Sequence, residues 1–566
     1  MNRIFIGAAL LLSHLGMAQL SPMDELELDS LYTEWSQNTG PGVAAGLMYG
    51  KEISYIKGFG LADVEHNTAI TPKTKFQVDH LSRQFTVLAL LILEQQGKLK
   101  LDDPVRNYVT DLPNYGHDLL LRHLVNHTSG LNDCNTVKYI LGKEEDDVFT
   151  HQDALRLIRS QKTLNFKPGT SFSYIVSKTE LTLIAEVVAK VSEQSFAAFT
   201  KEHIFEPLEM KDSQFLEDYN AIIPGGAKSY QLQNEELINK ALNQSDAGPT
   251  NLFTSVEDMF IWYSWFNYPG DAGLSVSLKR LDEPAQLDAG GTFDSAWGKM
   301  TLGREFYHKE RGLPCYWQYG LSGGYAANVF RFPEQQLISF VLGNNNRYNG
   351  MPAMSMAYHF LDDKFPEPQS IDASKISTKK VNSSRLKSYE GEYWNKKRAL
   401  ARKLFVSNDT LRYARLNEDE GLPMIPLEKG ERFQLLVDSD DKIILGFKET
   451  NGSETYGITL GDSDPSYYEK YAPISPTTEQ LHTYSGSYYS ESLGVVYTFS
   501  VKTDGLQAEG PDGTLVEFFP VVKDVFRSQI AAFGSINFER DTEGDIDAFT
   551  IQTDGIEGLK FVKFDI

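Results

Sequence analysis

FQVDHLSRQFTVLALLILEQQGKLKLDDPV, residues 76–105, is the stretch of the chain that decides the fold. From Leu81 to Leu93 the run leaves little polar face, which predicts a helix that is buried on almost all sides. Gly97 supplies a C-terminal stop, and Asp102-Asp103-Pro104 then turns the chain. We therefore expect a central helix around which a large domain is built.

Length, composition and charge narrow the class of protein. A chain of 566 residues is too long for one domain and predicts about three. A hydrophobic fraction of 41% with 12% aromatic residues is typical of globular proteins rather than of disordered ones. The formal net charge of −23 argues against binding to nucleic acid or to anionic membrane surfaces.

The first residues have the pattern of a secretory signal. Arg3 is followed by an apolar run from Ile4 to Leu12 and by small residues that end at Ala18. We predict a signal peptide over residues 1–18, cleaved after Ala18, and hence a secreted or periplasmic protein. A membrane anchor is the alternative, although the run is shorter than the ~20 residues that a span needs. No later stretch predicts a transmembrane span.

Two sets of markers carry a family resemblance. The central helix is followed by Gly97-Lys98-Leu99 and by LDDPV at 101–105, and LLRHLVNHTSGL stands at 120–131. These runs resemble serine β-lactamases and penicillin-binding-protein-like hydrolases, in the branch of class C β-lactamases, D-Ala-D-Ala carboxypeptidases and related esterases. The resemblance covers roughly residues 42–344. It implies an α+β fold, a β-lactamase/transpeptidase-like domain with an antiparallel sheet flanked by helices and a helical subdomain.

The reactive positions of this family are replaced here. Where the resemblance implies a Ser-x-x-Lys motif, the chain has His80 and Arg83. The Tyr-x-Asn motif keeps Tyr174 but has Val176 in place of the amide. The third motif, a Lys or His two residues before a glycine, matches Gln318-Tyr319-Gly320, which keeps only Gly320.

These replacements remove the groups that acyl transfer needs. A serine hydroxyl attacks after a base has taken its proton, and the family's lysine can lose its own proton to become that base. Arg83 stays protonated, and His80 has no hydroxyl. Ser82 lies two residues along the helix from His80 and is expected to point roughly 200° away from it.

The sequence therefore predicts a catalytically degenerate homologue that binds a ligand or a partner. The alternative is an active hydrolase of β-lactam, D-amino-acid peptide or ester substrates with an atypical mechanism. No catalytic residue is assigned, and four side chains at the family positions are candidates for ligand binding: His80, Arg83, Tyr174 and Gln318.

The expected ligand follows from the cation in the old site. Arg83 is a planar cation suited to a carboxylate or phosphate, so an anionic peptide or glycan fragment would fit, and a protein partner is the other possibility. The rival interpretation is that Arg83 pairs with Asp79 and fills the old cavity. We predict no cofactor and no metal. His123 and His127 have a spacing that zinc can use on a helix, but we expect buried core histidines.

The two cysteines, Cys134 and Cys315, leave a choice. The resemblance places both near the mouth of the active site, and an exported protein meets an oxidising compartment, so a disulfide is possible. Two buried thiols are the alternative.

Elsewhere, local patterns predict the elements around the central helix. An amphipathic helix is expected over 23–35, followed by a hairpin of 42–49 with 53–60 that turns at Gly50-Lys51. An apolar helix is expected over 181–191. Residues 331–334 and 338–344 resemble the closing strands of the family's sheet.

Beyond residue 362 the character of the chain changes. Residues 363–384 are polar and rich in lysine and serine, and predict a linker between a β-lactamase-related domain, residues 22–362, and short alternating strands. LKSYEGEY at 386–393 recurs as LHTYSGSY at 481–488, 95 residues later. We predict two small all-β, lipocalin-like barrels, residues 385–470 and 476–566. Their aromatic residues are expected to pack in the barrel cores, and a ligand cavity lined by these residues is the alternative.

Overall fold

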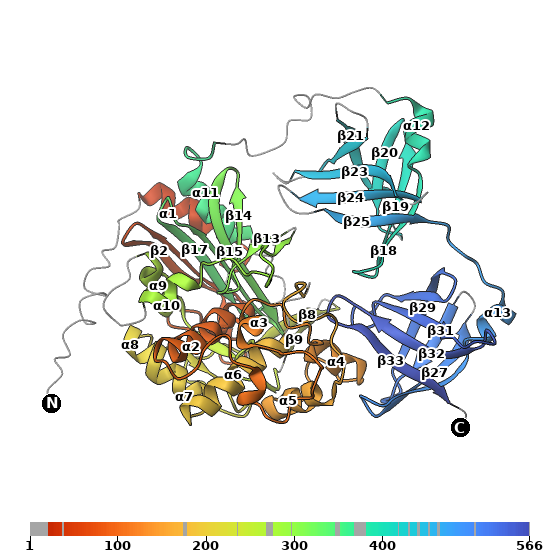
Figure 1. Cartoon of the computed structure of the whole chain (residues 1–566). Helices are drawn as coiled ribbons and strands as arrows, with labels where there is room; N and C mark the ends of the chain where they lie inside the picture. Colours follow the sequence, from red (N-terminus) through yellow and green to blue (C-terminus); the bar gives the residue numbers. More distant parts are fainter. Residues whose placement is uncertain are drawn as a thin grey trace.

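The computed structural model describes residues 21–36, 39–173, 178–234, 236–240, 242–267, 275–295, 297–345, 351–366, 381–416, 418–427, 431–437, 442–450, 453–460, 465–502 and 505–564. Figure 1 shows a mixed domain of helices and sheet followed by two β-barrels, the first green-blue and the second blue. The predicted signal peptide lies outside the described residues.

An antiparallel sheet of eight strands forms the centre of the first domain, in the order β12-β13-β14-β15-β16-β17-β1-β2. β1 and β2 are the predicted hairpin, and Gly50 between them has the positive φ of 64° that such a turn favours. β1 also pairs with β17, so the first and last strands of the domain lie side by side, next to the edge strand β2. The strands are β1 Val43–Tyr49, β2 Glu52–Phe59, β12 Asp294–Ser295, β13 Gly298–Met300, β14 Phe306–Glu310, β15 Leu313–Ser322, β16 Tyr325–Phe332 and β17 Leu337–Gly343.

The two faces of this sheet are covered by different helices. Side chains alternate along β1, so that Val43, Ala45 and Leu47 join a core with α1, Pro22–Ser30, and α11, Met351–Leu361. Ala44 and Met48 face the larger core on the other side, which contains the central helix. Because both faces of the sheet are covered, every residue of β16 and β17 is buried, including the polar Asn328, Arg331 and Ser339.

The central helix is α2, Arg83–Gln95, and a short 3₁₀ turn, η1, Asp79–Ser82, leads into it. Every residue from Arg83 to Leu93 is buried, as the sequence predicted. Gly97, with a φ of 71°, follows the end of the helix. The predicted helix of 181–191 is α6, Lys178–Ser192, and it packs along α2.

Shorter elements complete this domain. The other helices are η2 Val105–Asn107, α3 Leu121–Val125, α4 Cys134–Ile140, α5 His151–Ser160, α7 Phe196–Thr200, the π-helix η3 Lys201–Phe205, α8 Glu206–Leu208, α9 Val256–Asn267 and α10 Ser275–Arg280. The small sheets pair β3 Leu61–Asp63 with β4 Thr68–Ala69, β6 Phe149–Thr150 with β10 Gln244–Ser245, β8 Tyr230–Gln233 with β9 Glu236–Asn239, and β5 Phe76–Gln77 and β7 Gln214–Phe215 with β11 Leu252–Thr254.

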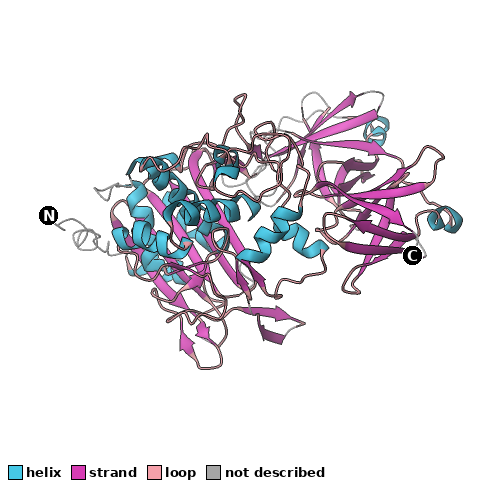
Figure 2. Ribbon diagram, turned by 60° about the horizontal axis from the view of Figure 1, so that its bottom comes forward, coloured by secondary structure: helices cyan, strands magenta, loops and turns pink. Residues whose placement is uncertain are grey.

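The C-terminal repeat folds into two β-barrels, as predicted, and each is a closed antiparallel barrel of eight strands (Figure 2, strands in magenta). Barrel 1 follows α12, Ser383–Ser388, and barrel 2 follows α13, Thr478–His482. Barrel 1 is β18 Gly391–Asn395, β19 Leu400–Ser407, β20 Thr410–Ala414, β21 Leu422–Pro426, β22 Arg432–Leu435, β23 Ile443–Thr450, β24 Ser453–Leu460 and β25 Ser466–Tyr471. Barrel 2 is β26 Gly486–Ser490, β27 Val495–Lys502, β28 Gly505–Glu509, β29 Leu515–Val522, β30 Val525–Ser528, β31 Ser535–Arg540, β32 Ile546–Gln552 and β33 Glu557–Phe564.

Barrel 2 docks directly on the first domain. Val137 and Ile140 of α4 belong to the apolar core of this barrel, and the hydroxyl of Tyr497 donates to the carbonyl oxygen of Ile140 over 2.6 Å. The backbone N–H of Asp133 donates to the carbonyl oxygen of Gly555. Barrel 1 touches barrel 2 through an outer apolar patch that includes Trp394 and Val521.

The first helix is shorter than the sequence predicted. The N-terminal helix ends at Ser30 rather than near residue 35. The hydroxyls of Ser30, Thr33 and Ser36 each donate to the carbonyl oxygen three residues earlier, and such bonds compete with helical ones.

Cys134 and Cys315 are both buried free thiols, so the disulfide is not formed. Within the described ranges, no helix has the length and hydropathy to cross a bilayer.

Candidate functional site

The end of β15 lies against η1, which brings two of the predicted positions together. A Cβ on Gly320 would stand 2.6 Å from the carbonyl oxygen of Val78 and 3.0 Å from the backbone nitrogen of His80, so only glycine fits there. Asp79 has a φ of 42°, a left-handed conformation that is costly for a residue other than glycine. A tight, strained turn therefore presents His80 beside the strand that carries Gln318 and Gly320.

His80 is the least buried residue of this turn. Its side chain is 36% exposed, whereas that of Asp79 is 3% exposed, and Nε2 of His80 lies 3.2 Å from Oδ2 of Asp79. The backbone N–H of Leu321 donates to the same Asp79 oxygen over 2.9 Å. Burial of the ring and the positive charges of Arg83 and Lys178 hold the pKa of His80 below its usual value. His80 is therefore a neutral imidazole at neutral pH.

Arg83 lies beneath His80 and is only 1% exposed. Among the residues that the structure describes, neither Nε nor Nη1 of its guanidinium has a hydrogen-bond partner. Burial lowers the pKa of Arg83 to about 10, although the charges of Asp79 and Asp133 favour the cation. The ion pair with Asp79 that the sequence left open is not found in this part of the chain, so Arg83 is a buried cation with two unused donors.

Ser82 is turned away from the site, as its helical position predicted. Its side chain is fully buried, and its Oγ accepts a hydrogen bond from the backbone N–H of Leu252 over 3.2 Å. A hydroxyl held in this way cannot meet a substrate beside His80. Tyr174 and Val176, the two family positions in the following loop, lie outside the described residues.

Gln318 is held by the protein itself. The residue is 3% exposed, its Nε2 donates to the carbonyl oxygen of Arg304, and its Oε1 accepts the N–H of Tyr319 over 2.9 Å. Its amide is therefore fixed in place by the backbone of Arg304 and Tyr319.

Sequence reasoning missed a buried ionic cluster below Arg83. Oε1 of Glu180 accepts the hydroxyl of Ser129 over 2.6 Å, while its Oε2 contacts Nδ1 of His127 and lies 3.6 Å from Nη2 of Arg304. Burial raises the pKa of Glu180, but His127, Arg304 and Ser129 outweigh it, and the pKa stays below its usual value. The run at 120–131 contained half of this cluster; its partners are more than fifty residues away in sequence.

Lys178 was missed as well. It is the first residue of α6, and its backbone N–H donates to Oδ1 of Asp133 over 3.0 Å. Its positive charge acts on both Asp79 and His80. With Arg83 it makes the surroundings of His80 electropositive.

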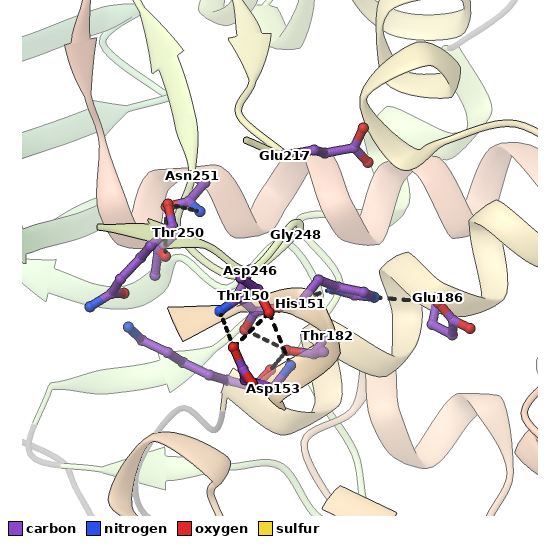
Figure 3. Close-up of polar contacts among 12 residues, drawn as sticks. Thr150, His151, Asp153, Thr182, Glu186, Glu217, Asp246, Gly248, Thr250 and Asn251 are labelled. Atoms are coloured by element: carbon purple, nitrogen blue, oxygen red, sulfur yellow. Dashed lines mark hydrogen bonds and ion pairs between the residues drawn. The ribbon is translucent and has the colours of Figure 1, made fainter. Parts of the chain in front are cut away.

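A second polar cluster joins α5, α6 and β10 (Figure 3). Nδ1 of His151 lies 3.0 Å from Oδ1 of Asp246, Nε2 lies 3.3 Å from Oε2 of Glu186, and the hydroxyl of Thr182 donates to the other oxygen of Asp246. Although burial opposes it, the two carboxylates raise the pKa of His151 to about 9. This charged imidazole clamps three elements together, and none of the predicted site residues belongs to it.

The two histidines with zinc spacing have separate acidic partners. His123 is buried, and its Nε2 lies 3.1 Å from Oδ2 of Asp288, whereas His127 contacts Glu180. A cavity of about 650 Å³ opens beside His123, between Arg122 and Lys167, and His80, Arg83 and Gln318 do not line it.

The family model for beta-lactamase matches residues 28–359, which is more than half of the chain. This protein belongs to the beta-lactamase family. The match contains η1, α2, α6 and β15, the elements that carry the site. It ends before both barrels.

Curated relatives are similar over the same region. The D-aminopeptidase of Gluconobacter oxydans (strain 621H) is 30% identical over 256 residues, which are 44% of this chain and 47% of that protein. Protein flp of Staphylococcus aureus (strain MW2) is 27% identical over 266 residues, 45% of this chain and 52% of that protein. The chain thus spans about half the length of the curated relatives it matches.

Solved structures support the fold alone. The octameric penicillin-binding protein homologue from Pyrococcus abyssi superimposes with a TM-score of 0.53 at 21% identity, and covers 79% of this chain and 100% of that one. SurE superimposes with a TM-score of 0.51 at 17% identity, over 79% of this chain and 98% of that one.

Proposed function

We propose that this member of the beta-lactamase family is catalytically degenerate and uses the old active site to bind a ligand or a partner. One observation carries the proposal: Arg83, which the resemblance places at the family's general-base lysine, is buried, and its Nε and Nη1 have no hydrogen-bond partner among the described residues. A guanidinium with a pKa of about 10 cannot accept the proton of a nucleophile at neutral pH.

The nucleophile is missing in the same way. His80 occupies the serine position, and the nearest hydroxyl along the turn, that of Ser82, is buried against Leu252. A family enzyme needs both the hydroxyl and the base within hydrogen-bond reach of a substrate carbonyl. Among the residues that the structure describes around His80, neither group is in place, which supports the proposal.

We propose an anionic peptide or glycan fragment as the ligand, with a protein partner as the other possibility. The exposed imidazole of His80, the unused donors of Arg83 and the charge of Lys178 all favour a carboxylate or phosphate. Gln318 would contribute shape rather than hydrogen bonds, because both of its amide atoms are already bonded. Tyr174 is included in the proposed ligand site because it matches the tyrosine of the family's Tyr-x-Asn motif.

One feature favours the alternative, an atypical hydrolase of β-lactam, D-amino-acid peptide or ester substrates. His80 is neutral and partly exposed, so its ring could attack an acyl group and form an acyl-imidazole. Such an intermediate is labile, and the leaving group would take its proton from the remaining N–H of the acylated ring or from Asp79, whose pKa burial raises.

The two functions are separated by covalent labelling. Wild-type protein and a His80→Ser, Arg83→Lys variant are treated with a fluorescent penicillin and a fluorophosphonate, and intact mass is measured. We expect no adduct on the wild type. An adduct on the wild type would overturn the proposal, and peptide mapping would identify the nucleophile. The matched control is a His66→Ser, Arg156→Lys variant, which changes an exposed histidine and an exposed arginine that lie elsewhere in the domain. Its labelling is expected to match that of the wild type.

We also propose that the protein is exported, with cleavage after Ala18. The sequence of the first eighteen residues supports this, because it combines Arg3, a short apolar run and small residues before the cut. Intact mass of the protein recovered outside the cytoplasm tests it. A mass that still includes residues 1–18 would contradict the proposed cleavage.

A further inference from the structure

The two barrels are repeats, so each interior position of one has a counterpart in the other. Tyr393 pairs with Arg402 across β18 and β19, and Tyr488 pairs with Tyr497 across β26 and β27. The rings of Tyr456 and Tyr468 in barrel 1 stack with their centroids 4.9 Å apart. At the corresponding positions of barrel 2, the rings of Phe549 and Phe561 stack with their centroids 4.6 Å apart. The interior side chains of the two barrels can therefore be compared position by position.

In barrel 2 the end opposite α13 is occupied by the first domain. Tyr497 donates to the carbonyl oxygen of Ile140, and the side chains of Val137 and Ile140 complete the apolar core. Ile536 and Ile551, which lie in strands β31 and β32 of this core, are fully buried. Two apolar side chains of α4 and the carbonyl oxygen of Ile140 thus close this end of barrel 2.

In barrel 1 the same end carries a cation. Arg402 replaces Tyr497, and its Nε donates to the hydroxyl of Tyr413, which stands where barrel 2 has Ala508. Nη1 of Arg402 donates to the carbonyl oxygen of Ala401. Four polar groups, those of Arg402, Tyr413, Tyr456 and Tyr468, therefore stand where barrel 2 has one tyrosine and three apolar side chains.

This cation has no acidic partner in the described part of the chain. The groups that raise its pKa against burial are the tyrosines at 413, 456 and 468. Glu454, which lies near the hydroxyl of Tyr393, is paired with Lys470 at 3.2 Å. A partly buried guanidinium without a carboxylate is an unusual arrangement, since buried charges are normally paired.

Tyr456 adds an unused donor. Its side chain is fully buried, and its hydroxyl has no hydrogen-bond partner among the described residues. Leaving such a group unpaired is costly, and a ligand oxygen between Tyr456 and Arg402 would satisfy both.

The rim of this end is apolar. Ile443 and Ile458, the counterparts of Ile536 and Ile551, are only half-buried, as are Leu400 and Val437 beside the same core. Among the described residues, the first domain contributes no side chain to the core of barrel 1, whereas α4 contributes two to that of barrel 2.

We propose that barrel 1 binds an apolar monocarboxylic acid at this end. The carboxylate would accept hydrogen bonds from Arg402 and Tyr456, and the hydrocarbon would cover Leu400, Ile443 and Ile458. A closed barrel offers no free strand edge to pair with a peptide backbone, which favours a ligand without amides.

The test uses the full chain and fluorescence titration with 11-(dansylamino)undecanoic acid. We expect saturable binding that weakens at least about tenfold in Arg402→Gln, because a charge-assisted hydrogen bond is lost. Tyr456→Phe is expected to weaken binding less, and the methyl ester of the probe is expected to bind as weakly to the wild type as the acid does to Arg402→Gln. Arg415→Gln, at an exposed arginine of the same barrel, is the matched control and should bind as the wild type does.

Several results would overturn the proposal. They are no saturable binding of the acid, equal binding to wild type and Arg402→Gln, or equal binding of acid and ester. Preferential binding of a dansylated dipeptide acid would reject the ligand class. Thermal unfolding of each variant separates loss of binding from loss of fold, and Arg402→Gln should fold because it removes a charge that has no acidic partner.

Discussion

Nδ1 of His151 lies 3.0 Å from Oδ1 of Asp246, and these two residues, 95 positions apart, join the start of α5 to the residue that follows strand β10. Glu186 of α6 holds the other ring nitrogen. The clamp stabilises the helical part of the domain without touching the candidate site.

His151 should make the stability of this domain depend on pH. Its pKa is about 9 in the folded protein against an ordinary value of 6.5, so the stabilisation is fully present below pH 6.5 and is lost as pH rises through 9. We expect His151→Gln to lower the free energy of unfolding by about 1–3 kcal/mol at pH 6, and by less at pH 9.5. Denaturant titrations at both pH values measure this.

The control for this experiment is His66→Gln, since His66 also faces a carboxylate but is 72% exposed. It should change stability little at either pH, as exposed ion pairs contribute little. A gap between wild type and His151→Gln that did not narrow with pH would show that the ring is not charged in the folded protein.

Gly320→Ala tests the close approach of β15 to η1. The new Cβ would stand 2.6 Å from the carbonyl oxygen of Val78, and backbone cannot move aside without disturbing His80. We expect a loss of about 1–3 kcal/mol, measured by chemical denaturation. Gly40→Ala is the control, because nothing lies within 4 Å of a Cβ there. Equal stability of Gly320→Ala and wild type would mean that the turn is not held by this contact.

Much of the scaffold could be predicted because its signals are local. The apolar run from Leu81 to Leu93 specified α2, the glycine at 50 marked the hairpin turn, and the LKSYEGEY repeat indicated two similar barrels. Each of these depends on neighbours in sequence or on a copy of the same pattern.

The electrostatics of the site could not be predicted in the same way. Whether Arg83 meets a carboxylate depends on where Asp79 points, and the left-handed backbone at Asp79 turns its carboxylate toward Leu321 instead. The Glu180–Arg304 contact and the His151 clamp join segments that are distant in sequence, so no local pattern announces them.

Arg83 and Arg304 should respond oppositely to replacement by methionine. Arg304 is fully buried, donates to the carbonyl oxygen of Leu124 and lies 3.6 Å from Glu180, so Arg304→Met leaves a buried carboxylate with one partner fewer. We expect it to cost about 3–5 kcal/mol. Arg83→Met removes two unused donors, each of which costs about 1–3 kcal/mol when buried, so stability should stay level or rise.

Thermal and chemical unfolding of both variants measure the difference, with Arg156→Met as the surface control. A large loss of stability in Arg83→Met would show that the guanidinium is satisfied within the protein, and would remove the main support for a ligand at the old active site.

The docking of barrel 2 should depend on a few contacts of α4. Tyr497→Phe removes one hydrogen bond to the carbonyl oxygen of Ile140 and should lower the free energy of unfolding by about 1 kcal/mol. Ile140→Asp places a charge in the apolar core of barrel 2 and should separate this barrel from the first domain. Hydrogen exchange of the backbone amide of Asp133, which donates to Gly555, reports the separation. We expect faster exchange at that amide in Ile140→Asp and little change in Asp512→Asn, a conservative change beside the interface at Gly142. Unchanged protection in Ile140→Asp would mean that the main-chain contacts, rather than the apolar ones, hold the barrel in place.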